Sequence, residues 1–326
     1  MSKTNSNSTL FLIDGSTFIF RAYFAMYKAS QSRGSGFTRS DGTPTGAVMA
    51  FCNMMWKIIT NGIDGIHPSH IAVIFDTKEK TFRSDIYPLY KANRDAPPED
   101  LIPQFPLIHK AVEAFNIKCI SQIGYEADDL IATYSKIATK RNIKTIIISG
   151  DKDLMQLIDN NVRMYDPMPG KERFIDINGV QDKFGVAPDK VVDVQALAGD
   201  TTDNIPGVPG IGVKIASELI NEYHTLEGLL SNAKEIKQNK RRENLLKYAE
   251  DARISYQLAL LDSSSPIELD IDDLSNNQLD YDKIISFSKE MELSNLSSRI
   301  NNFFSKGESI HVESSNASVG NATPIS

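Results

Sequence analysis

The sequence has no apolar run of about 18 residues, which is the length that a membrane-spanning helix needs. Cysteine is scarce: only Cys52 and Cys119 occur, and both stand in apolar segments. We therefore expect reduced, buried thiols rather than disulfides or a thiolate metal site. The first nine residues, MSKTNSNST, lack the apolar core of a secretory signal. These absences predict a cytoplasmic chain with no membrane partner.

The sequence does contain four short apolar runs of β type, each followed by acidic side chains. The runs cover residues 10–13, 71–75, 116–120 and 145–148. Helical stretches separate them, and such runs are typical of buried strands in a parallel sheet. The acids that follow are Asp14, Asp76, Glu126, Asp128, Asp129, Asp151 and Asp153, and a glycine-flanked loop adds Asp200 and Asp203.

Because ligands of such sheets bind beyond the carboxyl ends of the strands, we expect these nine acids to converge at one edge. So many negative charges share a site only when cations neutralise them. A set of carboxylates without histidine or cysteine favours Mg²⁺ or Mn²⁺ over zinc, and two such ions are the usual means of phosphodiester cleavage. The alternative for each acid alone is a role at a helix N-terminus.

The alternation of strand and helix predicts an α/β fold with a doubly wound, mostly parallel sheet over residues 10–177. Within it we expect helices at 45–60, 103–115, 127–139 and 153–158. The section 178–304 is predicted to be all helical, with helices at 180–184, 188–197, 213–223 and 241–256. Residues 1–9 and 305–326 lack periodicity, and we expect them to be disordered.

A basic and aromatic stretch, KTFRSDIYPLYKANR, occupies residues 80–94. Rings interleaved with cations suit single-stranded nucleic acid, because rings stack on bases and cations hold phosphates. The alternative is a solvated charged helix, on which Lys91 and Arg94 would share a face. The net charge of −7 is no strong objection, since the chain without the nine clustered acids carries +2. The candidate residues are Lys80, Arg83, Tyr87, Tyr90, Lys91 and Arg94.

A glycine-rich hairpin, IPGVPGIGVK, occupies residues 205–214 between two predicted helices. Glycines permit tight turns and leave amides at a helix N-terminus free for a phosphate, with Lys214 beside them. Such a hairpin can hold a duplex by its backbone without reading sequence. The alternative is an ordinary helix–helix turn. The candidate residues are Gly207, Gly210, Gly212 and Lys214.

Five segments resemble successive motifs of the 5′–3′ exonuclease domain of bacterial DNA polymerase I, within the wider flap endonuclease family. They are LFLIDGSTFIFRAYFA, VIFDTKEKTFRSDIYPLYKANRDAPPEDL, YEADDLIATY, SGDKDLMQL and AGDTTDNIPGVPGIGVKIA. The resemblance covers about residues 9–300. It implies a PIN-like fold, a helical arch at about residues 78–100 and a helix–three-turn–helix DNA-binding element. The sequence has GDTTD where the family has GDSSD, and no polymerase section follows, so a stand-alone enzyme, a truncated homologue and a fragment all stay open.

The resemblance also implies roles for individual residues. The inner metal ligands would be Asp14, Asp76, Glu126, Asp128 and Asp129. A second ion would be held by Asp151, Asp153, Asp200 and Asp203. Tyr90, Lys91 and Arg94 would steer the scissile phosphate, and Arg21 would contact another phosphate. We further expect Arg83, Tyr87 and the glycine hairpin to contact DNA, with K⁺ as a candidate ion at the hairpin.

The activity implied is that of a metal-dependent 5′–3′ exonuclease and 5′-flap endonuclease that hydrolyses DNA in replication and repair and leaves 5′-phosphate products. Its substrates would be 5′ flaps, nicked or gapped duplexes and RNA-primed ends. We expect a nucleoid-associated bacterial monomer, with a DNA polymerase as candidate partner. Two alternatives are a non-catalytic DNA-binding module and a PIN-type ribonuclease, although the latter does not explain the arch and hairpin together.

Overall fold

The computed structural model describes residues 8–33, 36–168, 171–276 and 279–306. Its centre is a six-stranded sheet in the order β3-β2-β1-β4-β5-β6. Five strands are parallel, and β6 runs antiparallel to its neighbour β5. The strands are β1 (Thr9–Asp14), β2 (His70–Ile74), β3 (Lys118–Ile120), β4 (Lys144–Ile148), β5 (Val162–Asp166) and β6 (Arg173–Ile175).

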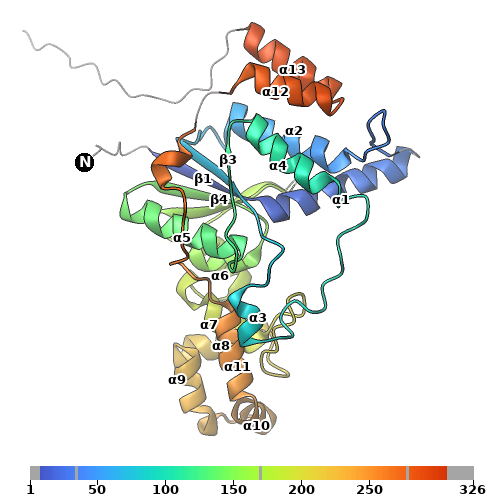
Figure 1. Cartoon of the computed structure of the whole chain (residues 1–326). Helices are drawn as coiled ribbons and strands as arrows, with labels where there is room; N and C mark the ends of the chain where they lie inside the picture. The colour runs from blue at the N-terminus through green and yellow to red at the C-terminus, as the bar shows by residue number, and fades with distance from the viewer. Residues whose placement is uncertain (1–7, 34–35, 169–170, 277–278, 307–326) are drawn as a thin grey trace, which may run out of the picture.

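The central strand β1 contributes side chains to two cores, one on each face of the sheet. Phe11 and Ile13 pack in the core that includes residues of α1 (Gly15–Arg33), α2 (Gly46–Asn61) and α4 (Gln104–Ala114). Leu10 and Leu12 pack in the core that includes α5 (Ala127–Lys140). Figure 1 shows these helices on opposite sides of the strands. Both faces are covered, so the strands consist of unbroken apolar runs. The prediction of a doubly wound, mostly parallel α/β sheet is confirmed.

Four predicted helices are confirmed to within one residue, namely α2, α4, α5 and α8 (Val213–Tyr223). The segment predicted as a helix at 153–158 is a 3₁₀ helix, Lys152–Leu157. The helix predicted at 180–184 is longer, as α6 (Ile177–Phe184), because Asp176 caps it by accepting a bond from the Gly179 amide at 3.0 Å. Helix α1 was not predicted from the sequence.

Two predicted helices in the second half of the chain are each divided. The segment 188–197 contains a 3₁₀ turn, Pro188–Lys190, followed by α7 (Val191–Ala198). The segment 241–256 is divided at Tyr248, whose backbone leaves α-helical geometry at φ −107° and ψ 24°. The resulting helices are α10 (Asn239–Lys247) and α11 (Ala249–Ala259). With α9 (Leu226–Ser231), helices α6 to α11 form the helical end of the molecule below the sheet in Figure 1.

The last two helices lie apart from this helical end. α12 (Tyr281–Glu290) and α13 (Ser294–Ser305) return to the sheet side of the molecule, at the top of Figure 1. Ile284 and Ile300 are buried in the same core as Phe11, and the Phe303 ring meets Trp56 edge-on with centroids 5.5 Å apart. These helices therefore cover the α2 and α4 side of the sheet.

The structure also bears on the predictions for the cysteines, for membrane-spanning helices and for the two ends of the chain. Cys52 and Cys119 are both free; Cys52 is buried, but Cys119 is only half-buried. No helix in the described part of the chain is long and apolar enough to cross a membrane. Residues 1–7 and 307–326, which we expected to be disordered, lie outside the described residues, while Thr9 begins β1.

Candidate active site

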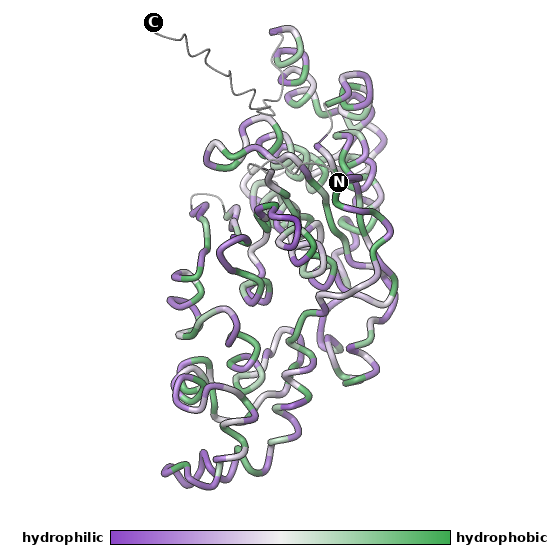
Figure 2. Tube along the Cα trace, turned by 90° about the vertical axis from the view of Figure 1, so that its left-hand side faces the viewer, coloured by the Kyte–Doolittle hydropathy of each residue, from purple (hydrophilic) through white to green (hydrophobic). Residues whose placement is uncertain are grey.

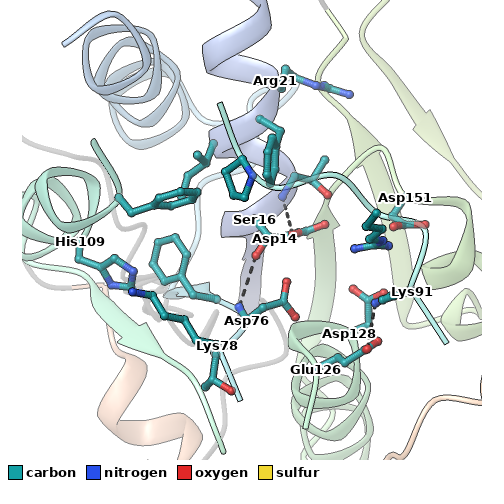
Figure 3. A pocket seen from close by; sticks show the side chains of 18 of the residues that line it. Asp14, Ser16, Arg21, Asp76, Lys78, Lys91, His109, Glu126, Asp128 and Asp151 are labelled. Carbon is teal, nitrogen blue, oxygen red and sulfur yellow. Dashed lines mark hydrogen bonds and ion pairs between the residues drawn. The ribbon is translucent and has the colours of Figure 1, made fainter. Parts of the chain in front are cut away.

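Five of the predicted acids line one cavity of about 650 Å³ beyond the carboxyl ends of β1 and β2 (Figure 3). They come from four separate points of the chain: the end of β1, the end of β2, the start of α5 and the loop after β4. Lys91 and Arg94 line the same cavity. The acids are Asp14, Asp76, Glu126, Asp128 and Asp151.

The two acids at the strand ends are fixed by bonds to neighbouring segments. Asp14 is only 3% exposed and accepts bonds from the Ser149 hydroxyl at 2.7 Å and the Thr17 amide at 2.9 Å. Asp76 lies two residues beyond β2 and accepts a bond from the Ala127 amide at 2.9 Å. That amide belongs to the first turn of α5, so the Asp76 carboxylate also satisfies a free helix N–H group.

The acids in this cavity repel one another. Burial raises the pKa of Asp14 to about 6, and the charge of Asp76 adds to the increase. Burial likewise raises the pKa of Asp128, followed by the charges of Asp151, Asp14 and Asp76. Among the described residues, no hydrogen-bond donor reaches the Asp128 carboxylate. The cluster therefore places several carboxylates without a cation partner among the described residues around one cavity, which is the environment that a hard divalent cation stabilises.

A second cavity of about 460 Å³ adjoins the first and shares Asp151, Arg21 and Arg94 with it. Lys152 forms an ion pair with Asp200. Asp153 accepts a bond from the Gln195 amide at 2.5 Å, and its pKa is raised to about 7 by burial and by the charge of Asp151. The acids of this cavity are Asp151, Asp153, Asp200 and Asp203, so the two cavities together contain all of the predicted acids except Asp129.

The predicted arch residues reach the acids from the opposite side. Lys91 Nζ lies 2.9 Å from Glu126 Oε1, and Arg94 donates to Asp203 Oδ1 at 2.5 Å. The Tyr90 hydroxyl donates to Glu126 Oε2 at 3.1 Å, and burial followed by the Glu126 charge raises its pKa. The three predicted catalytic residues are thus brought together with the acids, as Figure 3 shows for Lys91 and Glu126.

This part of the arch is a series of turns rather than a continuous helix. Only α3 (Phe82–Ile86) is helical in residues 78–100. It ends at Tyr87, which is extended at φ −143° because the next residue is Pro88. Lys91 has a φ of +56°, so it and Arg94 do not share a helical face as the sequence suggested.

Hydrogen bonds join the arch to the loop that carries Asp200 and Asp203. The Lys91 amide donates to the Asp203 carbonyl at 2.9 Å. Asn93 Nδ2 donates to the Thr201 carbonyl at 2.7 Å, and Asn204 Nδ2 donates to the Leu89 carbonyl at 2.7 Å. The loop follows no strand, yet these bonds hold its acids beside the arch cations.

Arg83 and Asp129 pair with each other in the interior of the protein. Both side chains are buried, 1% and 0% exposed, and form a two-point ion pair with nitrogen–oxygen distances of 2.7 and 2.8 Å. Asp129 also accepts bonds from the amides of Glu126 and Asp262. Four donors thus bond to the Asp129 carboxylate, and its role as an inner metal ligand stays a prediction. The Arg83 guanidinium lies in the interior, and its contact with DNA also stays a prediction.

Arg21 extends from α1 towards the boundary of the two cavities and lines both. Its Nη2 donates to Asp166 Oδ1 at 3.0 Å, whereas its buried Nη1 has no hydrogen-bond partner among the described residues. Asp166 ends β5, so the strand-end rule that identified Asp14 would have found it too. Tyr87 is half-buried, and its predicted DNA contact stays a prediction.

The glycine hairpin joins α7 to α8 through several turns, with positive φ at Gly207 (+61°) and Gly210 (+80°). Gly207 is buried, and its amide donates to the Ser255 hydroxyl at 2.9 Å. It therefore packs inside the hairpin, and its predicted contact with DNA stays a prediction. Gly210, Gly212 and Lys214 are exposed.

Several residues that support the site were not predicted from the sequence. Ser149 stands inside the SGDKDLMQL motif and bonds to Asp14, but hydroxyl side chains gave no separate signal. Thr17 and Ser16 bond to the strand-end segments from the start of α1, which was not predicted. His109 lines the first cavity with its ring centroid 4.1 Å from that of Phe75, and burial lowers its pKa.

The donor set fits Mg²⁺ or Mn²⁺, because the cavity acids supply only oxygen atoms and are mutually repulsive. As they stand, no three Asp, Glu, His or Cys side chains of the described residues are grouped closely enough to hold an ion. Glu126, Asp200 and Asp203 are instead paired with Lys or Arg side chains. Asp14, Asp76, Asp128 and Asp151 lack such cation partners within the described residues.

Comparison with known proteins identifies the family. A model described as the 5′–3′ exonuclease N-terminal resolvase-like domain matches residues 9–185, and the 5′–3′ exonuclease C-terminal SAM fold matches residues 186–282. The 5′–3′ exonuclease of Aquifex aeolicus (strain VF5) is 34% identical over 300 residues, which cover 91% of this chain and 96% of that protein. The chain belongs to the 5′–3′ exonuclease family. This family consists of structure-specific 5′ nucleases.

Two further comparisons define the extent of the match. DNA polymerase I of Rhizobium leguminosarum is 49% identical over 294 residues, which cover 89% of this chain but only 28% of that polymerase. The chain thus spans about a third or less of the length of the DNA polymerase I relatives that it matches. The bacteriophage T5 flap endonuclease, solved with DNA and metal ions, has a TM-score of 0.62 at 20% identity and covers 90% of this chain and 98% of its own. This last match shows that the fold is shared.

Proposed function

We propose that this chain is a metal-dependent 5′–3′ exonuclease and 5′-flap endonuclease that hydrolyses phosphodiester bonds in DNA. The observation that carries the proposal is the convergence of Asp14, Asp76, Asp128 and Asp151 from four points of the fold, with Lys91 and Arg94 facing them. An acid cluster alone would suit any small phosphate ester. The arch and the exposed glycine hairpin add surfaces suited to a strand and a duplex.

Asp14, Asp76, Glu126 and Asp128 would hold one divalent ion, and Asp151, Asp153, Asp200 and Asp203 would hold a second directly or through water. Bound Mg²⁺ or Mn²⁺ would supply activated water and stabilise the departing 3′ oxygen, leaving a 5′ phosphate. The Tyr90 hydroxyl and Lys91 ammonium bond to Glu126 and so orient that carboxylate. Lys91 and Arg94 offset negative charge on the scissile phosphate.

The substrate would lie across two surfaces of the chain. The duplex would rest on Gly210, Gly212 and Lys214, whose exposed amides and ammonium suit phosphate oxygens. K⁺ is a candidate ion at this hairpin. The 5′ strand would pass the arch to reach the acids, with Arg21 on its route. Flaps, nicked or gapped duplexes and RNA-primed ends in replication and repair fit this arrangement, with a DNA polymerase as partner and a monomer at the nucleoid as the working form.

The test is cleavage of a duplex bearing a labelled 5′ single-stranded flap. With Mg²⁺ we expect cuts near the flap junction and 5′-phosphate products, and excess chelator should abolish them. A matched 3′-flap duplex should stay intact, because the proposed route requires a free 5′ end. An uncut 5′ flap in Mg²⁺ would refute the proposal. Cleavage confined to flaps made of RNA would favour the ribonuclease alternative.

A further inference from the structure

A strongly basic segment of the chain lies beside the hairpin and has no role in the site described above. Residues 234–247 contain six basic and two acidic side chains, a net charge of +4 in a chain whose total is −7. Most of this charge is on α10, which lies at the lower end of Figure 1 and is mainly purple in Figure 2. Whether this charge is free to bind a ligand depends on the hydrogen bonds and ion pairs that surround it.

The helix α10 is anchored to the hairpin through Asn244. Asn244 Nδ2 donates a hydrogen bond to the Pro209 carbonyl at 2.7 Å. The same nitrogen would lie 3.8 Å from a Cβ added to Gly210, so Asn244 contacts the hairpin at two neighbouring residues. On the other side of α10, Leu245 is fully buried and fixes the helix to the helical core. Asn244 is therefore the α10 side chain that contacts the hairpin, and side chains one helical turn before and after it lie on the same face.

Those neighbours are Lys240 and Lys247, which stand four residues before and three residues after Asn244. Positions at this spacing share one face of an α-helix. Both lysines are exposed. Lys247 lies over the Tyr248 ring at 5.0 Å. Neither lysine forms an ion pair with a carboxylate among the residues that the structure describes. Glu243 stands three residues after Lys240 and four before Lys247, so it shares this side of the helix with both lysines.

Other basic side chains nearby, unlike these two lysines, form hydrogen bonds or ion pairs within the protein. Arg242 donates to the Ile236 carbonyl at 2.8 Å and to Asn239 at 2.8 Å. Arg253 on α11 pairs with Glu227 and Glu250. Lys240 and Lys247 therefore carry positive charge that no carboxylate pairs with among the described residues. The ordinary interpretation of such a segment is a charged helix that only faces solvent. That interpretation does not explain why Asn244 bonds α10 to the hairpin.

We propose that the α10 face formed by Lys240, Asn244 and Lys247 extends the hairpin surface along the phosphate backbone of a DNA duplex. The seven steps from Lys240 to Lys247 rise by about 10 Å along the helix. That length matches about three nucleotide steps of one strand. The face thus offers two further phosphate contacts without reading bases. This inference rests on the proposed function, since it assumes that the hairpin holds a duplex.

The experiment measures binding of the full chain to a 5′-flap duplex, with chelator present to prevent cleavage, over a series of salt concentrations. We expect the double substitution Lys240→Gln with Lys247→Gln to reduce the slope of log K against log salt by about 1.8, because each phosphate that a lysine neutralises adds about 0.9 to that slope. Affinity at low salt should fall about tenfold or more. Glu243→Gln should bind the duplex more tightly than the wild type.

The matched control changes the same charge elsewhere. Lys118 on β3 and Lys289 on α12 are exposed lysines on the sheet side of the molecule, and replacing both with Gln should leave the slope unchanged. An unchanged slope in the α10 variant, or an equal fall in the control, would overturn the inference. If the wild-type chain neither binds nor cuts the flap duplex, the proposed function itself fails, which is a separate result.

Discussion

Arg83 and Asp129 form a fully buried ion pair that joins three parts of the molecule. Arg83 lies on α3 at the base of the arch, and Asp129 lies in the first turn of α5. The same guanidinium donates to the carbonyls of Leu258 and Leu260, at the end of α11, at 2.8 and 3.1 Å. The arch, the helix that carries the cavity acids and the helical end of the molecule are therefore held at one point.

Removing one partner of this pair should destabilise the fold. Asp129→Asn would remove the two-point counter-charge of buried Arg83 and leave only the Glu126 carboxylate, 3.7 Å away; breaking such a buried pair costs about 3–5 kcal/mol. We expect a clear fall in the free energy of unfolding, measured by urea denaturation without metal. Arg83→Met with Asp129→Leu should recover part of the loss, because replacing a whole buried pair by apolar side chains is often nearly neutral.

Asp128→Asn should have the opposite effect and is the natural comparison. Burial and the charges of Asp151, Asp14 and Asp76 oppose ionisation of Asp128, so its neutral amide counterpart relieves repulsion. We expect stability without metal to rise by about 1 kcal/mol. The same denaturation assay measures both variants. Equal destabilisation by the two substitutions would contradict the division of these adjacent acids into a cavity residue and a packing residue.

Lys91→Ala should reduce the rate of cleavage more than it reduces binding. Lys91 reaches Glu126 at the cavity and is positioned to offset charge on the reacting phosphate. Loss of one such group typically lowers kcat by about 10²-fold or more. Single-turnover cleavage of a 5′ flap and duplex binding in chelator separate the two effects. A large loss of duplex affinity with an unchanged cleavage rate would show that Lys91 only tethers the substrate.

The hairpin glycines should differ sharply in their tolerance of alanine. Gly207 has positive φ, and an added Cβ would lie 2.4 Å from the Gly199 nitrogen. We expect Gly207→Ala to cost about 2–4 kcal/mol of unfolding free energy. Gly212 has an ordinary φ of −93° and open space around it, so Gly212→Ala should change stability by less than about 0.5 kcal/mol. Thermal unfolding of both variants tests this, and similar losses would contradict it.

The strand-end acids could be predicted from the sequence because the parallel sheet fixes their location. Asp14 and Asp76 each follow an apolar run, and β1 and β2 are adjacent and in parallel register. Their convergence therefore follows from local patterns alone. Asp200 and Asp203 follow no strand, so their location could not be predicted in this way. The bonds from Lys91, Asn93 and Asn204 place their loop, and these are contacts between distant parts of the chain.

Two features of the structure could not be predicted from the sequence, for specific physical reasons. Asp128 and Asp129 are neighbours in one motif, but successive residues of a helix point about 100° apart. Which of them faces the cavity depends on Arg83, which lies 46 residues away. Helix α1 was missed because Phe20, Phe24 and Tyr27 are exposed on it, by 37%, 52% and 49%. These aromatic side chains on the solvent side remove the apolar periodicity from which a helix is recognised.

The central claim is that the converging carboxylates support metal-dependent cleavage of DNA. The most direct test is the single-turnover cleavage rate of the double variant Asp151→Asn with Asp153→Asn on a 5′-flap duplex, measured across a Mg²⁺ titration. Duplex affinity is measured alongside in chelator. We predict that cleavage is abolished at every Mg²⁺ concentration while duplex affinity is retained. Cleavage at the wild-type rate, or loss of duplex binding without any catalytic defect, would contradict the account.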